Sequence, residues 1–159
     1  MPQENINRPI MYIYTSIAQA ENPMGENPTH QESGTYQQII LIDDDRITNI
    51  LSTRMLSKYA PDLTVEVFED IDTAIAHVSQ LPNPENYLIL LDLNFPVKSG
   101  WDFLDAYQHM AHKANVVVLT SSIDESDKQR ALSYLTVRKF MSKPLNALLI
   151  EQLKQLQKN

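Results

Sequence analysis

Short apolar runs recur along the chain from residue 37 onward, and they alternate with stretches whose apolar residues have helical spacing. Three of the runs carry no alternating polar residues, which is typical of strands buried on both faces of a sheet. A fourth segment is rich in β-branched residues and alternates, which also favours a strand. Five strands are predicted, at residues 39–42, 63–68, 87–91, 116–119 and 137–141.

An amphipathic stretch that predicts a helix follows each of these strands. In the first, Pro61 ends the helix, and five apolar residues stand at helical spacing before it: Ile47, Ile50, Leu51, Met55 and Leu56. The helices are predicted at residues 47–59, 71–81, 101–111, 126–135 and 145–156. Because a parallel crossover needs a covering helix, five strand–helix repeats predict an α/β fold, a doubly wound parallel sheet with helices on both faces.

The first 36 residues differ in composition from the rest. They hold four of the nine prolines and two of the three glycines, and residues 21–38 are almost entirely polar. This composition predicts a flexible N-terminal extension over residues 1–36 and a folded domain over residues 37–159. A cleaved signal peptide stays open as an alternative, because an apolar stretch at residues 10–20 ends in Ala-x-Ala.

Composition also excludes several kinds of function. The 159-residue chain has no cysteine, which removes disulfides, thiol nucleophiles and cysteine-ligated metals. Its four histidines show no metal-ligand spacing. The formal net charge of -7 disfavours nucleic acid and anionic membranes as direct partners, and no apolar run approaches the roughly 20 residues of a membrane span.

Polar side chains stand directly after the apolar strands. The residues are Asp43, Asp44 and Asp45 after the first strand, Asp92 after the third, Thr120 at the end of the fourth and Lys143 after the fifth. Parallel strands of a doubly wound sheet end at the same edge, so we expect these side chains to converge there. Helix capping explains one of the three consecutive aspartates, most naturally Asp45, but not all of them.

This set of side chains suits one kind of chemistry. Clustered carboxylates repel one another unless a cation binds, and oxygen ligands without histidine or cysteine favour Mg²⁺. A carboxylate beside Mg²⁺ is a plausible nucleophile toward a phosphoryl group. The ammonium of Lys143 and the hydroxyl of Thr120 could then stabilise the phosphoryl charge.

Taken together, the segments resemble the receiver domain of two-component response regulators over residues 37–156. The matching segments are residues 39–45, 91–100, 118–121 and 140–145. The resemblance implies a five-stranded flavodoxin-like (βα)5 fold with strand order 2-1-3-4-5. Because nothing follows Asn159, we expect a stand-alone receiver in the cytoplasm, which is no enzyme beyond catalysing its own phosphorylation and dephosphorylation.

The resemblance also implies a role for each residue. Asp92 would be the phosphoacceptor, and Lys143 would contact the phosphoryl oxygens. Thr120 and Phe140 would be the switch residues. Mg²⁺ would be held by Asp43, Asp44, Asp92 and the backbone carbonyl of Asn94.

The same resemblance has further implications for backbone geometry and for partners. The Lys143–Pro144 bond would be cis, and Gly100 would allow a tight turn into the third helix. The expected partner is a sensor histidine kinase or a histidine phosphotransfer protein, with the downstream target open. A weak homodimer is compatible with the resemblance.

Two other functions stay open at this point. A receiver-like interaction module could work without phosphorylation, although the full set of site residues argues against it. A Mg²⁺-dependent aspartyl-phosphate hydrolase of the haloacid-dehalogenase type uses the same ingredients. Its nucleophile, however, lies in an early D-x-D, and it has late acidic ligands that have no counterpart after Lys143.

Overall fold

The computed structural model describes residues 36–156, and they form a five-stranded sheet. The strands are β1 (Gln38–Ile42), β2 (Thr64–Phe68), β3 (Tyr87–Leu91), β4 (Asn115–Thr120) and β5 (Val137–Ser142). All neighbouring strands are parallel, and their order is β2-β1-β3-β4-β5. The predicted fold class and strand order are therefore confirmed.

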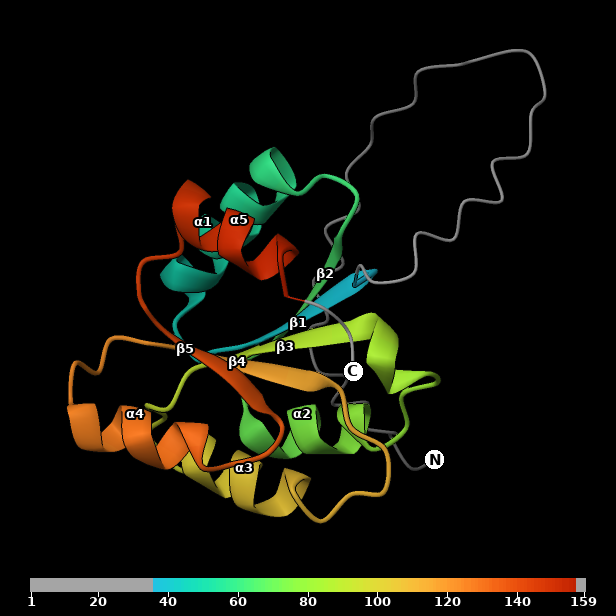
Figure 1. The fold of residues 1–159 in the computed structure, drawn as a ribbon, viewed down its shortest axis with the longest axis vertical. Coiled ribbons are helices and arrows are strands. Elements are labelled where there is room, and N and C mark those ends of the chain that lie inside the picture. Colours follow the sequence, from blue (N-terminus) through green and yellow to red (C-terminus); the bar gives the residue numbers. More distant parts are fainter. Residues whose placement is uncertain (1–35, 157–159) are drawn as a thin grey trace, which may run out of the picture.

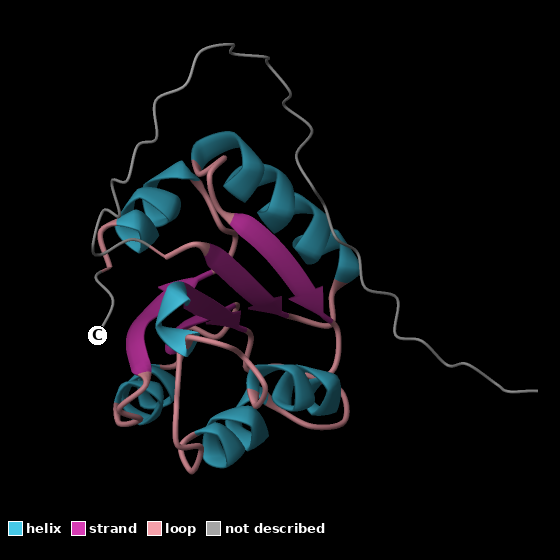
Figure 2. Ribbon diagram, turned by 90° about the vertical axis from the view of Figure 1, so that its right-hand side faces the viewer, coloured by secondary structure: helices cyan, strands magenta, loops and turns pink. Residues whose placement is uncertain are grey.

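Helices connect the strands and cover both faces of the sheet (Figures 1 and 2). They are α1 (Arg46–Tyr59), α2 (Ile71–Val78), α3 (Gly100–Tyr107), α4 (Glu125–Leu132) and α5 (Ala147–Lys154), with a 3-10 turn η1 (Pro84–Asn86). Helices α1 and α5 lie on one face, and α2, α3 and α4 lie on the other (Figure 1). None of the helices in the described segment has both the length and the apolarity needed to cross a bilayer.

Alternation along each strand fills two separate cores. Ile39 and Leu41 of β1 pack toward the face that carries Leu56 of α1 and Ile150 of α5. The intervening residues, such as Ile40, pack toward α2, α3 and α4. A strand with a core on both sides needs apolar residues at every position, which is why the central strands read as continuous apolar runs.

The extension predicted for residues 1–36 lies outside the described residues, apart from Tyr36. The Tyr36 side chain is buried in the core beneath α1 and α5, and its hydroxyl accepts a hydrogen bond from Asn115 Nδ2 at 2.7 Å. Helix α3 ends at Tyr107 instead of the predicted residue 111. The chain turns back there, and the backbone N–H of Ala114 donates to the Tyr107 hydroxyl at 2.7 Å.

Helix α1 forms where it was predicted, but three of its apolar residues face away from the sheet. Ile47, Ile50 and Leu51 are 70%, 43% and 54% exposed. Among the residues that α1 buries are Asn49 and Leu56. Helical spacing correctly predicted the helix, but spacing alone does not show which of its apolar residues face the core.

Candidate functional site

The carboxyl ends of β1 and β3 bring two aspartates together. Ile42 and Leu91 are partners in the parallel ladder, and the next residues, Asp43 and Asp92, follow side by side. Carboxylate oxygens of Asp43, Asp44 and Asp92 all lie within 4.8 Å of one another. Asp43 and Asp92 are buried, at 1% and 5% exposure, whereas Asp44 is more open. The convergence expected from the strand ends is present.

Lys143 reaches into this cluster from the end of β5. Its Nζ lies 2.6 Å from Asp43 Oδ2 and donates a hydrogen bond to Asp92 Oδ2 at 2.7 Å. Its backbone N–H donates to the carbonyl of Thr120 at 2.9 Å, which fixes the start of the side chain. The Lys143–Pro144 bond is cis, as expected. One ammonium therefore sits between two buried carboxylates.

Burial and charge shift the protonation equilibria of this pair. Desolvation raises the pKa of Asp43, although its contacts with Lys143 and with the Asp45 N–H act in the opposite direction. Burial by itself would lower the pKa of Lys143, but its close contacts with the carboxylates of Asp43 and Asp92 raise it overall. Lys143 is accordingly a cation at neutral pH, held in place by the carboxylates it neutralises.

Asp45 has a separate role, as a helix cap. Its Oδ1 accepts from the Ile47 N–H at 2.9 Å, and its Oδ2 accepts from the Thr48 hydroxyl at 2.8 Å. The Thr48 contact, followed by the Ile47 contact, lowers the pKa of the Asp45 carboxyl. The capping role predicted for Asp45 is confirmed, and the three consecutive aspartates divide into two site residues and one cap.

The cluster fits a divalent cation. Asp43 Oδ2 is buried and forms an ion pair with Lys143 Nζ at 2.6 Å, which leaves part of its accepting capacity unused. That oxygen keeps lone pairs for another cation. A set made only of carboxylate oxygens suits hard ions such as Mg²⁺, Mn²⁺ or Ca²⁺. The acidic pocket is therefore able to bind a divalent cation.

Thr120 ends β4 with a fully buried side chain at the same edge of the sheet. Its Oγ1 accepts hydrogen bonds from Asn94 Nδ2 and from the backbone N–H of Ser122, each at 3.3 Å. Ser122 in turn donates through its own hydroxyl to Asp127 of α4 at 2.6 Å. The sequence gives no signal for the roles of the Asn94 and Ser122 side chains, because polar residues two or three positions after a strand end are common in loops.

Asn49 and Gly100 also shape the site, through contacts with the backbones of Asp43 and Asp92 that the sequence did not predict. Asn49 in α1 donates from Nδ2 to the Asp43 carbonyl at 2.8 Å, which ties the helix to the acidic loop. A Cβ at Gly100 would lie 2.2 Å from the Asp92 carbonyl oxygen and 2.8 Å from Leu93 Cα. Glycine is required there by this close approach of α3 to the Asp92 backbone.

Phe140 lies on β5 opposite Val118 of β4, half-buried against the core on the side of α2, α3 and α4. This position is two residues before the end of β5 and close in sequence to Lys143. Its role as a switch residue stays a prediction, as does the use of the Asn94 carbonyl as a cation ligand.

The sequence and the fold now allow the family to be stated. The model of the response regulator receiver domain matches residues 39–155. This chain belongs to that family. Receiver domains act in two-component signalling and are not classical enzymes, so the acidic cluster is that of a signalling domain.

Solved receiver structures resemble this receiver domain closely in fold. A two-component response regulator from Cytophaga hutchinsonii has a TM-score of 0.65 at 26% identity, covering 75% of this chain and 94% of its own. A receiver domain from Rhodospirillum rubrum has a TM-score of 0.63 at 25% identity, covering 77% and 98%. The Mn²⁺-bound form of the response regulator Rcp1 has a TM-score of 0.59 at 28% identity, covering 75% and 89%. No curated protein matches the chain.

Proposed function

We propose that Asp92 accepts a phosphoryl group from a phosphohistidine and that the receiver signals through the resulting change in its protein-binding surface. The observation that carries the proposal is the position of the Asp92 carboxylate, buried beside Asp43 and contacted by the Lys143 ammonium at 2.7 Å. A carboxylate in such a setting has both a nucleophilic oxygen and cationic partners for the charge that it receives.

In the proposed step, a carboxylate oxygen of Asp92 forms a bond to phosphorus while the phosphorus–nitrogen bond of the donor breaks. The electron pair of that bond returns to the imidazole, and the product is an acyl phosphate on Asp92. Lys143 pairs with the phosphoryl oxygens in place of the free Asp92 carboxylate. The Thr120 hydroxyl donates to the same oxygens, and Phe140 follows Thr120 inward.

Asp43, Asp44 and Asp92, together with the backbone carbonyl of Asn94, are the residues that would hold Mg²⁺. When bound, the cation neutralises negative charge on the phosphoryl oxygens as they approach the carboxylates. The buried carboxylate of Asp43 and the all-oxygen ligand set support this assignment. The Mn²⁺-bound Rcp1 structure supports it further, as a divalent-cation complex of a similar fold.

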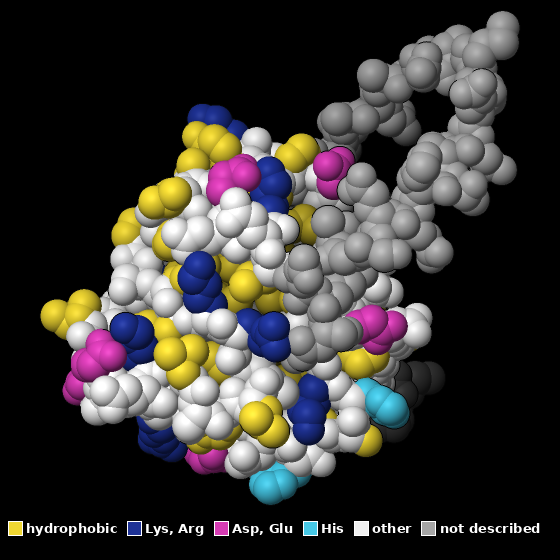
Figure 3. Space-filling model, viewed as in Figure 1, with side chains coloured by type: hydrophobic (Ala, Val, Ile, Leu, Met, Phe, Trp, Pro, Cys, Tyr) yellow, Lys and Arg dark blue, Asp and Glu magenta, His cyan; other side chains and the backbone are white. Residues whose placement is uncertain are grey.

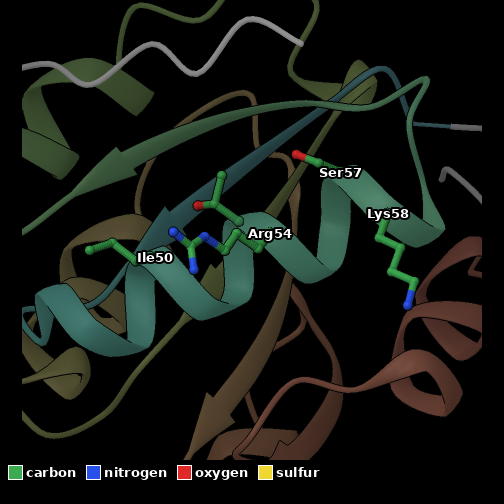
Figure 4. Close-up of a pocket in the computed structure, with 5 residues that line it drawn as sticks. Ile50, Arg54, Ser57 and Lys58 are labelled. Carbon is green, nitrogen blue, oxygen red and sulfur yellow. The ribbon is translucent and has the colours of Figure 1, made fainter.

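The partner that we propose is a sensor histidine kinase or a histidine phosphotransfer protein, met in the cytoplasm. We expect its protein to approach over the start of α1, which begins directly after the acidic residues. The exposed Ile47, Ile50 and Leu51 give this end of α1 an apolar surface. Farther along α1, Ile50, Arg54, Ser57 and Lys58 line a hollow of about 500 Å³ (Figure 4).

Charge also favours a protein partner over nucleic acid. Lys and Arg side chains on the face shown in Figure 3 are dispersed among polar and apolar atoms and do not form a continuous basic patch there. With a net charge of -7, the chain lacks the attraction to phosphate backbones on which non-specific nucleic-acid binding depends.

The test is labelling by a small phosphodonor. We expect acetyl phosphate with Mg²⁺ to label the wild-type receiver on one site and to leave Asp92→Asn unlabelled, since an amide oxygen is a poor nucleophile. Phosphate-affinity gel shift and intact mass measure the labelling. Asp45→Asn is the matched control, because it removes the same charge and asparagine caps a helix as well as aspartate does. Labelling of Asp92→Asn at the wild-type level would contradict the proposal.

A further inference from the structure

We propose that the side-chain amide of Asn94 is a positioning group for Thr120: it occupies a lone pair of the hydroxyl oxygen and thereby leaves the hydroxyl proton free to donate to a phosphoryl group on Asp92. The inference rests on the proposed function, but it concerns a residue whose side chain that function does not use. Its contact with Thr120 spans 26 positions of the chain, from the loop after β3 to the end of β4.

The argument begins with the capacity of a hydroxyl group, which can donate one hydrogen bond and accept two. Asn94 Nδ2 and the backbone N–H of Ser122 both donate to Thr120 Oγ1. The two accepting positions are therefore filled. Within residues 36–156, the Thr120 hydroxyl accepts both of its hydrogen bonds, and its own proton is therefore available to donate.

The burial of Thr120 restricts where its hydroxyl proton can point. The Thr120 side chain is fully buried, so its proton cannot readily be turned toward bulk water. The carbonyl of the same residue accepts from the Lys143 N–H, and Lys143 Nζ contacts Asp92, so the hydroxyl stands at the edge of the sheet where a phosphoryl group on Asp92 would lie. A preset donor at that position needs no reorientation when the phosphoryl charge appears.

The lengths of the two contacts also fit such a role. At 3.3 Å each, they are longer than the usual 2.9–3.0 Å for an N–H···O bond, so they restrain the hydroxyl weakly. Thr120 can then shift toward a phosphoryl oxygen at little cost. Of the two donors, only that of Asn94 belongs to a side chain, and Asn94 lies in an exposed loop position where substitution leaves the core intact.

The test is a double-mutant cycle between Asn94→Ala and Thr120→Val, read as the rate of labelling by acetyl phosphate with Mg²⁺. Valine keeps the shape of threonine and removes the hydroxyl. If Asn94 acts through that hydroxyl, Asn94→Ala slows labelling about two- to fivefold, the factor that corresponds to one long neutral hydrogen bond of roughly 0.5–1 kcal/mol. In the Thr120→Val background the same change has no effect. Equal slowing in both backgrounds, or no slowing in either, overturns the inference.

A second readout needs no phosphorylation and separates this inference from the proposed function. In the ¹H–¹⁵N spectrum, one side-chain amide proton of Asn94 is expected downfield of its free position, and it moves upfield in Thr120→Val. Unchanged Asn94 amide shifts in that variant overturn the inference. If the amide responds but the wild-type protein is never labelled, the positioning contact stands and the phosphoacceptor proposal fails.

Discussion

At the scale of single residues, the site depends on one buried cation held between two buried carboxylates. The Lys143 side chain is 14% exposed, and its partners Asp43 and Asp92 are 1% and 5% exposed. Removing one member of a buried ionic group leaves the others uncompensated, which costs more than the intact group contributes. Lys143 is therefore expected to contribute both to the stability of the fold and to the proposed phosphoryl transfer.

Replacing Lys143 by methionine is expected to lower the free energy of unfolding at pH 7 by about 3–5 kcal/mol. Burial already raises the pKa of Asp43, and loss of the lysine raises it further. A carboxyl whose pKa is higher in the folded protein than in the unfolded chain destabilises the fold when it ionises. Its contribution to stability is therefore present in acid and is lost as the pH rises through the folded pKa. The deficit of the variant should consequently shrink as the pH falls below neutrality.

Urea denaturation at several pH values measures this deficit. Lys154→Met is the control, because Lys154 forms an exposed pair with Glu151 and its loss should cost less than about 1 kcal/mol at any pH. A Lys143→Met deficit that stays constant between pH 7 and pH 4.5 would show that the buried carboxylates are not its cause.

At the scale of secondary-structure elements, α3 is fitted against the Asp92 loop at Gly100. The Gly100 N–H donates to the Leu93 carbonyl at 3.0 Å, and the site of a Cβ is already filled by the Asp92 carbonyl oxygen. The glycine lets the first turn of α3 touch the backbone of the proposed phosphoacceptor. The sequence-based expectation of a tight turn identified the right residue, and the structure adds the close contact as the reason.

Gly100→Ala therefore reverses the usual effect of this substitution. In a helix, alanine is ordinarily more favourable than glycine by about 1 kcal/mol. At Gly100 we expect a loss of about 1–3 kcal/mol from overpacking, with slower labelling of Asp92 because its backbone must shift. Gln129→Ala, at an exposed position of α4, should change neither stability nor labelling appreciably. A Gly100→Ala protein as stable and as readily labelled as the wild type would refute the close contact.

Of the five α-helices in the described segment, α4 has the fewest buried residues, with Ala131 as its one buried residue. The Arg130 guanidinium lies 4.1 Å from the Trp101 ring centroid, and the Tyr134 hydroxyl after α4 donates to Asp105 of α3 at 2.5 Å. Elements with few buried apolar contacts open at low cost. The surface around α4 is accordingly well suited to change when the site changes.

At the scale of the whole molecule, cation binding and folding are linked. A ligand that binds only the folded state stabilises it, by about 2.7 kcal/mol at 100 times its dissociation constant. We expect Mg²⁺ to raise the midpoint of thermal unfolding of the wild-type receiver, and excess EDTA to reverse the rise. The effect requires the acidic cluster, whose carboxylates converge only when β1 and β3 pair.

Asp44→Asn and Asp45→Asn distinguish specific binding from general screening of the acidic chain. Both remove one charge at neighbouring positions, but only Asp44 belongs to the cluster, while Asp45 caps α1. Mg²⁺ should therefore stabilise Asp45→Asn as it does the wild type, and Asp44→Asn much less. Equal responses of the two variants would mean that the cation acts by screening alone.

The sequence alone determined the succession of elements and the chemistry at the ends of the strands. Both are local properties: a continuous apolar run can only be a buried strand or core segment, and the residue after a parallel strand lies at the carboxyl edge of the sheet. For this reason the sequence alone predicts that four side chains converge at this edge: Asp43, Asp92, Thr120 and Lys143. The resemblance to receiver domains added the strand order.

Only the tertiary structure decided the orientation of α1 and the contact of Asn94 with Thr120. These depend on which neighbours are present in space, and periodicity carries no such information. Asn49 is an example: this polar residue of α1 faces inward because its side chain donates a hydrogen bond to the Asp43 carbonyl. That acceptor exists only after the strand and the helix have packed.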